Sequence, residues 1–373
     1  MTADPKSFKP SMILFFASVS HVVWLMWSQP TIQITPCGPL SPHDLDSLYM
    51  VEAITMIRKT ASLLTILSTL LIHTTTIIPD CLGQVKTGAN PSSQLADLSG
   101  LAWVEGDKFI GVHDAKTDDA EMLKPRIAKL QLPKNLSGIT HEDRRLTFHG
   151  TPPNDLESIA KIPSSTEYLL VESGDSMQDP SVQRIFKATL QDGQFKIVNQ
   201  TQWPVKIHNV EGTAVAALGN TFVFVFAERA DNQSSTDLCW ITFNPVSMKF
   251  AKQVNRIKFQ SPDPQRFNRV IVGLDIDSTG LIYSVSAFDA ESAGLPNPDN
   301  GPYASGIYEI GRITMQNNTP KIQLHAKPIE HALVDGFKVE SIAVRKTNTN
   351  ARPQLFIGTD DENYGGTLRQ LAQ

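Results

Sequence analysis

Acidic residues recur along this chain at two kinds of position whose spacing could bring them together for chemistry. One kind lies inside a short repeated phrase, where the candidates are Glu157, Glu211, Asp275 and Glu340, with Ser99 in the first copy. The other kind closes the apolar run after each phrase, where the candidates are Asp114, Glu172, Glu228, Asp289 and the run Asp360-Asp361-Glu362. The two kinds are separated by about 15 to 20 residues, the length of two short strands and a turn.

Carboxylates gathered in such number repel one another unless something compensates for their charge. Raised pKa values, basic partners or a bound cation can supply that compensation. Ca²⁺ is a candidate cofactor because it prefers several oxygen ligands in flexible geometry. The candidate basic partners, which could also bind an anion, are Arg229, Lys338 and Arg269. The alternative is structural: each carboxylate accepts backbone N–H bonds at a strand end and holds neighbouring elements together.

One histidine lies next to a member of the second acidic set. His113 directly precedes Asp114. It is a candidate ligand or base, since imidazole changes charge near neutral pH, and a capping or surface role is the alternative.

The elements that must position these residues are repeated units. The phrase occurs five times, as Asp97–Ala102, Asp155–Ala160, Val210–Val215, Val272–Ile276 and Val339–Val344, about 55 to 65 residues apart. Each copy is followed by β-branched apolar runs bounded by Gly, Asp and Ser, which predict strands. A third run follows in every copy, and a fourth in the first four copies, exemplified by Leu146–Phe148, Gln194–Val198 and Ile322–Leu324.

Four strands per repeat predict an all-β fold, a β-propeller of four-stranded blades. We favour five blades, and six is the alternative. The last copy lacks a fourth strand, which residues such as Gln84–Thr87 could supply by closing the ring. In a blade the start of the first strand and the end of the second lie on the same side, so both acidic sets are expected around one mouth of the central channel.

Composition and motifs exclude several classes of protein. The formal net charge of -5 argues against a nucleic-acid-binding surface. The nucleophile elbow, the phosphate-binding loop and the common zinc and redox motifs are absent from the sequence. Of the 3 cysteines only Cys239 lies in the repeat region, where a small buried apolar role is expected.

The N-terminal part of the chain predicts export. Residues 56–83 contain Arg58 and Lys59 followed by the apolar stretch Ala61–Ile72, which is the pattern of a signal peptide. Residues 1–55 are interpreted as an over-extended start or an extra hydrophobic segment, and residues 84–373 as the propeller domain. We therefore expect a periplasmic or extracellular monomer that meets the membrane only through its N-terminal segment. A membrane anchor formed by an uncleaved segment is the alternative.

The repeated phrase also resembles a known family signature. Leu98–Ala102, Asp155–Ala160 and Lys338–Ala343 resemble the LSGLA and DLEGIA phrases of exported bacterial propellers called esterase-like activity of phytase and SdiA-regulated. The phytase-like name implies calcium-supported hydrolysis of phosphomonoesters, with acidic residues holding the metal and basic residues holding phosphate. Glu157 and Glu340 match the acidic position of the signature, and Ser99 departs from it.

Two functions follow from these observations. The first is a non-catalytic propeller that binds a small molecule, a cation or a protein partner at its acidic mouth. The second is a calcium-dependent hydrolase of phosphoesters or related esters at the same mouth, which would need cationic groups for the developing charge. The discriminating observation is whether Arg229, Lys338 or Arg269 projects into that mouth.

Overall fold

The computed structural model describes residues 95–114, 126–133, 139–144, 146, 148, 153–174, 183–290, 292–295, 301–346, 352–361 and 365–372. All of them belong to the second of two units of the chain, Gln84–Gln373. The signal segment, the residues before it and the proposed closing strand at Gln84–Thr87 lie outside the described residues. In the part of the chain that is described, no helix is both long enough and apolar enough to cross a membrane.

The described strands form five antiparallel sheets, each a blade in sequence order. Blade 1 consists of β1 (Gly100–Glu105), β2 (Lys108–Val112), β3 (Ile127–Gln131) and β4 (Thr140–Arg144). Blade 2 consists of β5 (Leu156–Lys161), β6 (Glu167–Glu172), β7 (Arg184–Gln191) and β8 (Gln194–Gln202). Blade 3 consists of β9 (Val210–Leu218), β10 (Thr221–Glu228) and β11 (Ser235–Asn244), with both β12 (Lys249–Phe250) and β13 (Asn255–Gln260) paired to β11.

The last two blades differ in size. Blade 4 consists of β14 (Arg269–Ile276), β15 (Leu281–Phe288), β16 (Ala304–Gln316) and β17 (Thr319–Asp335). Blade 5 contains the described strands β18 (Val339–Arg345), β19 (Gln354–Thr359) and β20 (Leu368–Gln370). The expected fourth strand of blade 1 at Leu146–Phe148 is wrong, because β4 ends at Arg144 and Phe148 instead packs edge-on against Phe186 of blade 2.

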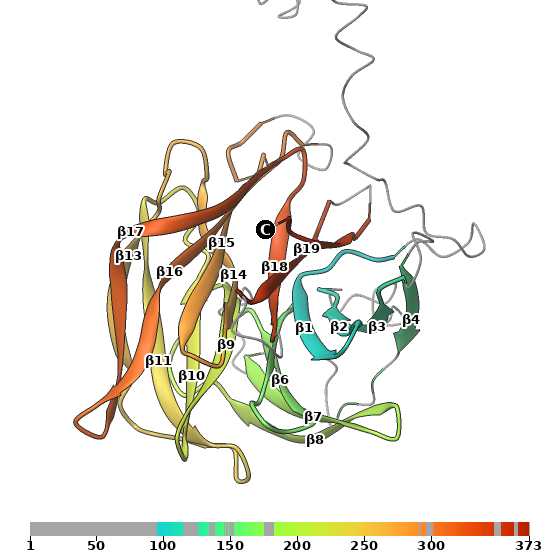
Figure 1. Ribbon diagram of the computed structural model, residues 1–373, viewed down its shortest axis with the longest axis vertical. Coiled ribbons are helices and arrows are strands. Elements are labelled where there is room, and N and C mark those ends of the chain that lie inside the picture. Colours follow the sequence, from blue (N-terminus) through green and yellow to red (C-terminus); the bar gives the residue numbers. More distant parts are fainter. Residues whose placement is uncertain are drawn as a thin grey trace, which may run out of the picture. The chain divides into compact units, whose positions relative to one another are not determined.

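The first strands of the five blades close into a ring. β1 contacts β5, β5 contacts β9, β9 contacts β14, β14 contacts β18, and β18 contacts β1. Figure 1 shows the blades following one another from cyan to red around this ring. The chain is therefore a five-bladed β-propeller, and the predicted all-β fold with five blades is confirmed.

Burial explains why the inner and outer strands have different sequences. The inner strand β5 is buried from Leu156 to Ala160, because neighbouring blades cover both of its faces. The outer strand β8 alternates exposed and buried residues over Gln194–Val198, because only one face meets the core. The apolar clusters accordingly span adjacent blades, as where Leu156 and Ile159 of blade 2 join Ile110 of blade 1.

The two ends of the described domain meet at the junction between blades 5 and 1. The N–H of Leu98 donates to the carbonyl of Thr359 at 2.9 Å, and the N–H of Gly366 donates to the carbonyl of Leu95 at 2.9 Å. The hydroxyl of Ser341 donates to the carbonyl of Leu98 at 2.9 Å. The segment just before β1 therefore joins the ring to blade 5.

Candidate functional site at one mouth of the channel

The acidic residue of the repeated phrase occupies a β-bulge in three blades. In blade 2, Leu156 pairs with Glu172 and Ser158 pairs with Val171, which leaves Glu157 as the extra residue. The register skips Glu211 of blade 3 between Val210 and Gly212, and Glu340 of blade 5 between Val339 and Ser341, in the same way. A bulge redirects a side chain that regular pairing would place against a neighbouring blade.

The small residue that follows the acidic position of the phrase lets adjacent inner strands approach closely. A Cβ atom on Gly100 would lie 3.0 Å from the Cα of Ser158, and one on Gly273 would lie 2.8 Å from the carbonyl oxygen of Glu340. In the next junction, the hydroxyl of Thr213 donates to the hydroxyl of Ser158 at 2.8 Å. The repeated phrase thus combines a redirected acidic residue with a small residue at the contact between blades.

The second acidic set lies at the same end of the inner strands as these bulges. Glu172 pairs with Leu156 at the start of β5, and Glu228 pairs with Val210 at the start of β9. Asp114, Asp289 and Asp360 each follow the second strand of their blade, after Val112, Phe288 and Thr359. One mouth of the channel therefore carries acids from both sets.

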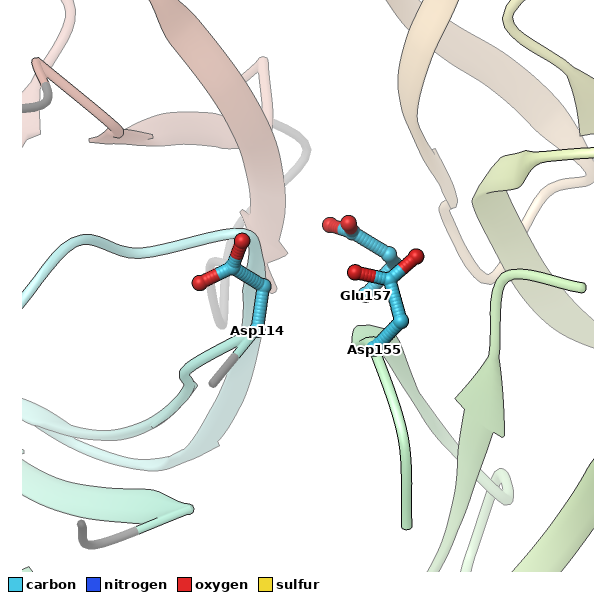
Figure 2. A group of neighbouring side chains, drawn as sticks. All are labelled: Asp114, Asp155 and Glu157. Atoms are coloured by element: carbon cyan, nitrogen blue, oxygen red, sulfur yellow. The ribbon is translucent and has the colours of Figure 1, made fainter. Parts of the chain in front are cut away.

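Three carboxylates from blades 1 and 2 converge at this mouth. Oxygen atoms of Asp114, Asp155 and Glu157, one from each residue, all lie within 4.8 Å of one another. Figure 2 shows Asp155 and Glu157 side by side on one segment and Asp114 on the segment opposite them. Asp155 is 2% exposed and Glu157 is 7% exposed, whereas Asp114 is only partly buried. We refer to these three residues as the acidic triad.

Local backbone geometry positions Asp155 in the triad. Asp155 has a φ of 62°, in the left-handed region that Asp and Asn tolerate better than most residues. Its carbonyl accepts the N–H of Ser173 at 3.0 Å, and its carboxylate accepts the hydroxyl of the same serine. Sequence reasoning missed Asp155 as a site residue. An available signal was the Asp or Asn two residues before Ser99, Glu157 and Glu211, which is Asp97, Asp155 and Asn209.

Blades 3, 4 and 5 contribute acids that alternate with buried cations. Arg269 is 4% exposed and contacts three carboxylates: Asp289 at 2.7 Å, Glu340 at 2.9 Å and Asp231 at 3.3 Å. Lys338 is 2% exposed and lies 3.2 Å from Asp360, 3.4 Å from Glu340 and 3.9 Å from Asp289.

Arg229 extends this set of contacts into blade 3. It lies 2.7 Å from Glu211 and 2.7 Å from Asp231, so that Asp231 joins Arg229 to Arg269. All three predicted basic residues therefore project among the acids of this mouth. Asp231 was missed from sequence because it belongs to the loop after β10 rather than to either repeated position. We call the acids and cations of these three blades the ion-pair network.

Two carboxyl groups of the network hold their protons more tightly than usual. Burial raises the pKa of Glu340 to about 8, an effect that Lys338 opposes and the neighbouring Asp360 increases. Burial also raises the pKa of Glu211 to about 6, against the opposing charge of Arg229. Both carboxyl groups therefore take up protons more readily than exposed carboxyl groups do.

Other predicted site residues are occupied by structural contacts. Glu172 is fully buried and accepts from the Arg184 side chain at 2.7 and 3.0 Å and from two backbone N–H groups, of Asn154 and Arg184. Glu228 accepts the N–H of His208 at 2.8 Å. The carboxylate of Asp361 accepts the N–H of Lys338 at 2.8 Å. These three carboxylates therefore accept backbone hydrogen bonds that hold neighbouring segments together, which is the structural role given above as the alternative to a binding site.

Asp275 does not lie at this mouth, so its expected position is wrong. It pairs with Tyr283 next to the turn between β14 and β15, at the far end of the inner strand. Its carboxylate accepts the N–H groups of Ile276 at 2.8 Å and Val344 at 2.6 Å. Gly273 corresponds to the small residue of the other copies, which places Val272 at the acidic position of blade 4.

His113 has a capping contact rather than a place in the triad. It is 4% exposed, and its Nδ1 atom lies 2.6 Å from the carbonyl oxygen of Asp97, so Nδ1 carries the proton. Burial lowers the pKa of His113, which favours the neutral ring. Ser99, which replaces the acid in the first copy, is 2% exposed.

Comparisons with known proteins bear on the fold only. No family model and no curated protein sequence matches the chain. Solved structures similar to it include a thermostable family-43 glycoside hydrolase (TM-score 0.44, 10% identity, 76% of this chain and 90% of that one). Another is an α-L-arabinanase of Cellvibrio cellulosa (TM-score 0.43, 11% identity, 74% of this chain and 92% of that one).

A third similar structure is the native arabinanase of Bacillus subtilis (TM-score 0.39, 12% identity, 74% of this chain and 94% of that one). Structural similarities with such low TM-scores and sequence identities do not support the assignment of an activity. The resemblance to the phytase-like and SdiA-regulated families receives no support from these comparisons. What the chain does must therefore be inferred from the residues at its own channel mouth.

Proposed function

We propose that this propeller is a binding protein that takes a hard divalent cation, Ca²⁺, in the acidic triad at its channel mouth. The observation that carries the proposal is the convergence of Asp114, Asp155 and Glu157 within 4.8 Å of one another. Calcium–oxygen distances are about 2.3–2.6 Å, so two ligands on opposite sides of one ion lie about 4.6–5.2 Å apart. The triad therefore accommodates one calcium ion without a large movement of any side chain.

Burial makes a cation favourable at this place. Two of the three carboxylates are less than a tenth exposed and are therefore poorly hydrated. A divalent ion would supply a charge that attracts all three carboxylates. Asp114 is partly exposed, so water or an oxygen atom of a polar ligand could complete the coordination.

The basic residues support binding rather than phosphoester hydrolysis. Arg269 and Lys338 do project into the mouth, but they are 4% and 2% exposed and each contacts three carboxylates. A phosphate group would have to displace these carboxylates to reach the cations, and separating buried ion pairs is costly.

The test is a calcium titration of the full chain and its Glu157→Gln variant, followed by melting temperature and by calorimetry. An ion that binds only the folded state stabilises it by about 2.7 kcal/mol at a hundred times its dissociation constant. We expect calcium to stabilise the wild type, and Glu157→Gln to lose most of the effect. Glu228→Gln, which removes a carboxylate at the same mouth outside the triad, is the matched control and should respond like the wild type.

A titration with magnesium distinguishes a site that fits calcium from a general attraction of cations to negative charge. Mg²⁺ requires distances of about 2.0–2.1 Å and loses its water reluctantly, so it should stabilise the protein less than Ca²⁺ does. Equal stabilisation of wild type and Glu157→Gln by calcium, or no stabilisation of either, would refute the proposal.

A further inference from the structure

A cavity, which we call the second cavity to distinguish it from the acidic mouth, lies at the opposite end of the inner strands. It measures about 370 Å³ and is lined by residues of all five inner strands and two of their turns. Its walls include Trp103 of β1, Lys161 of β5, Leu218 of β9, Asp275 of β14 and, just after β18, Lys346. Its volume lies at the lower end of the range of small-molecule pockets, about 300–1,000 Å³.

The two acidic side chains of this cavity already accept hydrogen bonds from backbone N–H groups. Asp275 accepts the N–H groups of Ile276 and Val344. One oxygen of Asp277 accepts from the N–H and the hydroxyl of Thr279, both at 2.8 Å, and from the N–H of Leu281 at 3.0 Å. Burial also raises the pKa of Asp275 to about 7, which reduces its negative charge at neutral pH.

The lysines of the cavity keep donor capacity for a ligand. Lys161 is half-buried, donates to the carbonyl of Val104 at 2.6 Å and lies 5.3 Å above the ring of Trp103. An ammonium group has three donors, so this contact leaves donors on Lys161. Lys161 and the exposed Lys346 both line the cavity. Burial lowers the pKa of Lys161, an effect that the nearby charge of Glu105 opposes and the charge of Lys346 increases.

The rest of the wall is apolar. Leu101, Ile159, Val215 and Leu218 line it together with the ring of Trp103. An anionic group between two ammonium groups relieves their mutual repulsion, and an apolar body against these side chains is removed from water.

We propose that this second cavity binds a small organic carboxylate with a flat apolar body, its carboxylate held by Lys161 and Lys346 and its body packed against Trp103 and the apolar wall. This site is separate from the acidic triad, which lies at the other end of the inner strands. The proposal does not depend on cation binding there.

The test compares two probes of the same shape, 1-naphthylacetate and the neutral 1-naphthylacetamide, by calorimetry on the full chain. We expect the acetate to bind about tenfold more tightly than the amide, since a charged partner strengthens a hydrogen bond by this order. Lys346→Gln should weaken acetate binding about tenfold and leave amide binding unchanged. Higher salt should weaken the acetate more than the amide.

Two further variants locate the site. Ser278→Trp places a large side chain at an exposed position of the cavity wall and should abolish binding of both probes. Lys258→Gln removes a lysine of blade 3 that is 57% exposed and pairs with Asp237, and it should bind like the wild type. Equal affinity for acetate and amide, unchanged binding in Lys346→Gln or Ser278→Trp, or no binding of the acetate by the wild type would overturn the proposal.

Discussion

Replacing Arg269 by Met tests whether the ion-pair network supports the folded ring. Arg269 is 4% exposed and lies within 3.3 Å of carboxylates from blades 3, 4 and 5. Met preserves much of the side-chain volume and removes the charge, so three acids lose their shared partner. Removing one partner of a buried pair costs about 3–5 kcal/mol. At roughly 2 °C per kcal/mol for a domain of this size, the melting temperature should fall by about 6–10 °C.

The control is Arg266→Met, three residues earlier in the chain. Arg266 pairs with Asp335 at 2.5 Å, but the two side chains are 33% and 79% exposed. An exposed pair of this kind contributes about 0–1 kcal/mol, so the control should melt close to the wild type. Equal melting temperatures for the two variants would refute the account of the network.

Two other predictions concern stability, beside those for the cation and the carboxylate probe. Because the pKa values of Asp275 and Glu340 are raised to about 7 and 8, the folded state binds protons that the unfolded state has released, so stability should fall as pH rises from about 4 to 8. Asp275→Asn should reduce the difference in melting temperature between pH 5 and pH 8. An unchanged difference would contradict a raised pKa for Asp275. Gly273→Ala should destabilise the domain by about 1–3 kcal/mol in urea unfolding, because its Cβ would lie 2.8 Å from the carbonyl oxygen of Glu340. If Gly273→Ala is as stable as the wild type, β14 and β18 are not in close contact at this position.

Much of the fold could be predicted from the sequence because each blade repeats the same local pattern. β-branched runs with turn residues between them predict strands, and the number of copies of the phrase predicts the number of blades. The outer strand of blade 1 could not be located this way. Leu146 and Phe148 resemble a strand because they are apolar, but they pack against the core between blades 1 and 2.

The channel mouth was predictable in outline and not in detail. Strand direction alone places Glu157 and Glu172 at the same end of blade 2. Whether a carboxylate then faces the channel or a buried arginine depends on bulges and on contacts between blades. Asp275 was misplaced because the phrase in blade 4 matches the other copies only through Gly273, and a shift of a few residues moves an acid to the other end of a strand.

The bond between Leu98 and Thr359 has a consequence for how the protein is made. Synthesis proceeds from the N-terminus, so the triad residues of blades 1 and 2 are in place long before Lys338 and Thr359 have been added. Until then the apolar face of blade 1 that packs against Ala343 and Phe356 of blade 5 is uncovered, and exposed apolar surface recruits other chains. Chains that end prematurely are therefore expected to associate with one another unless chaperones cover that face during translation.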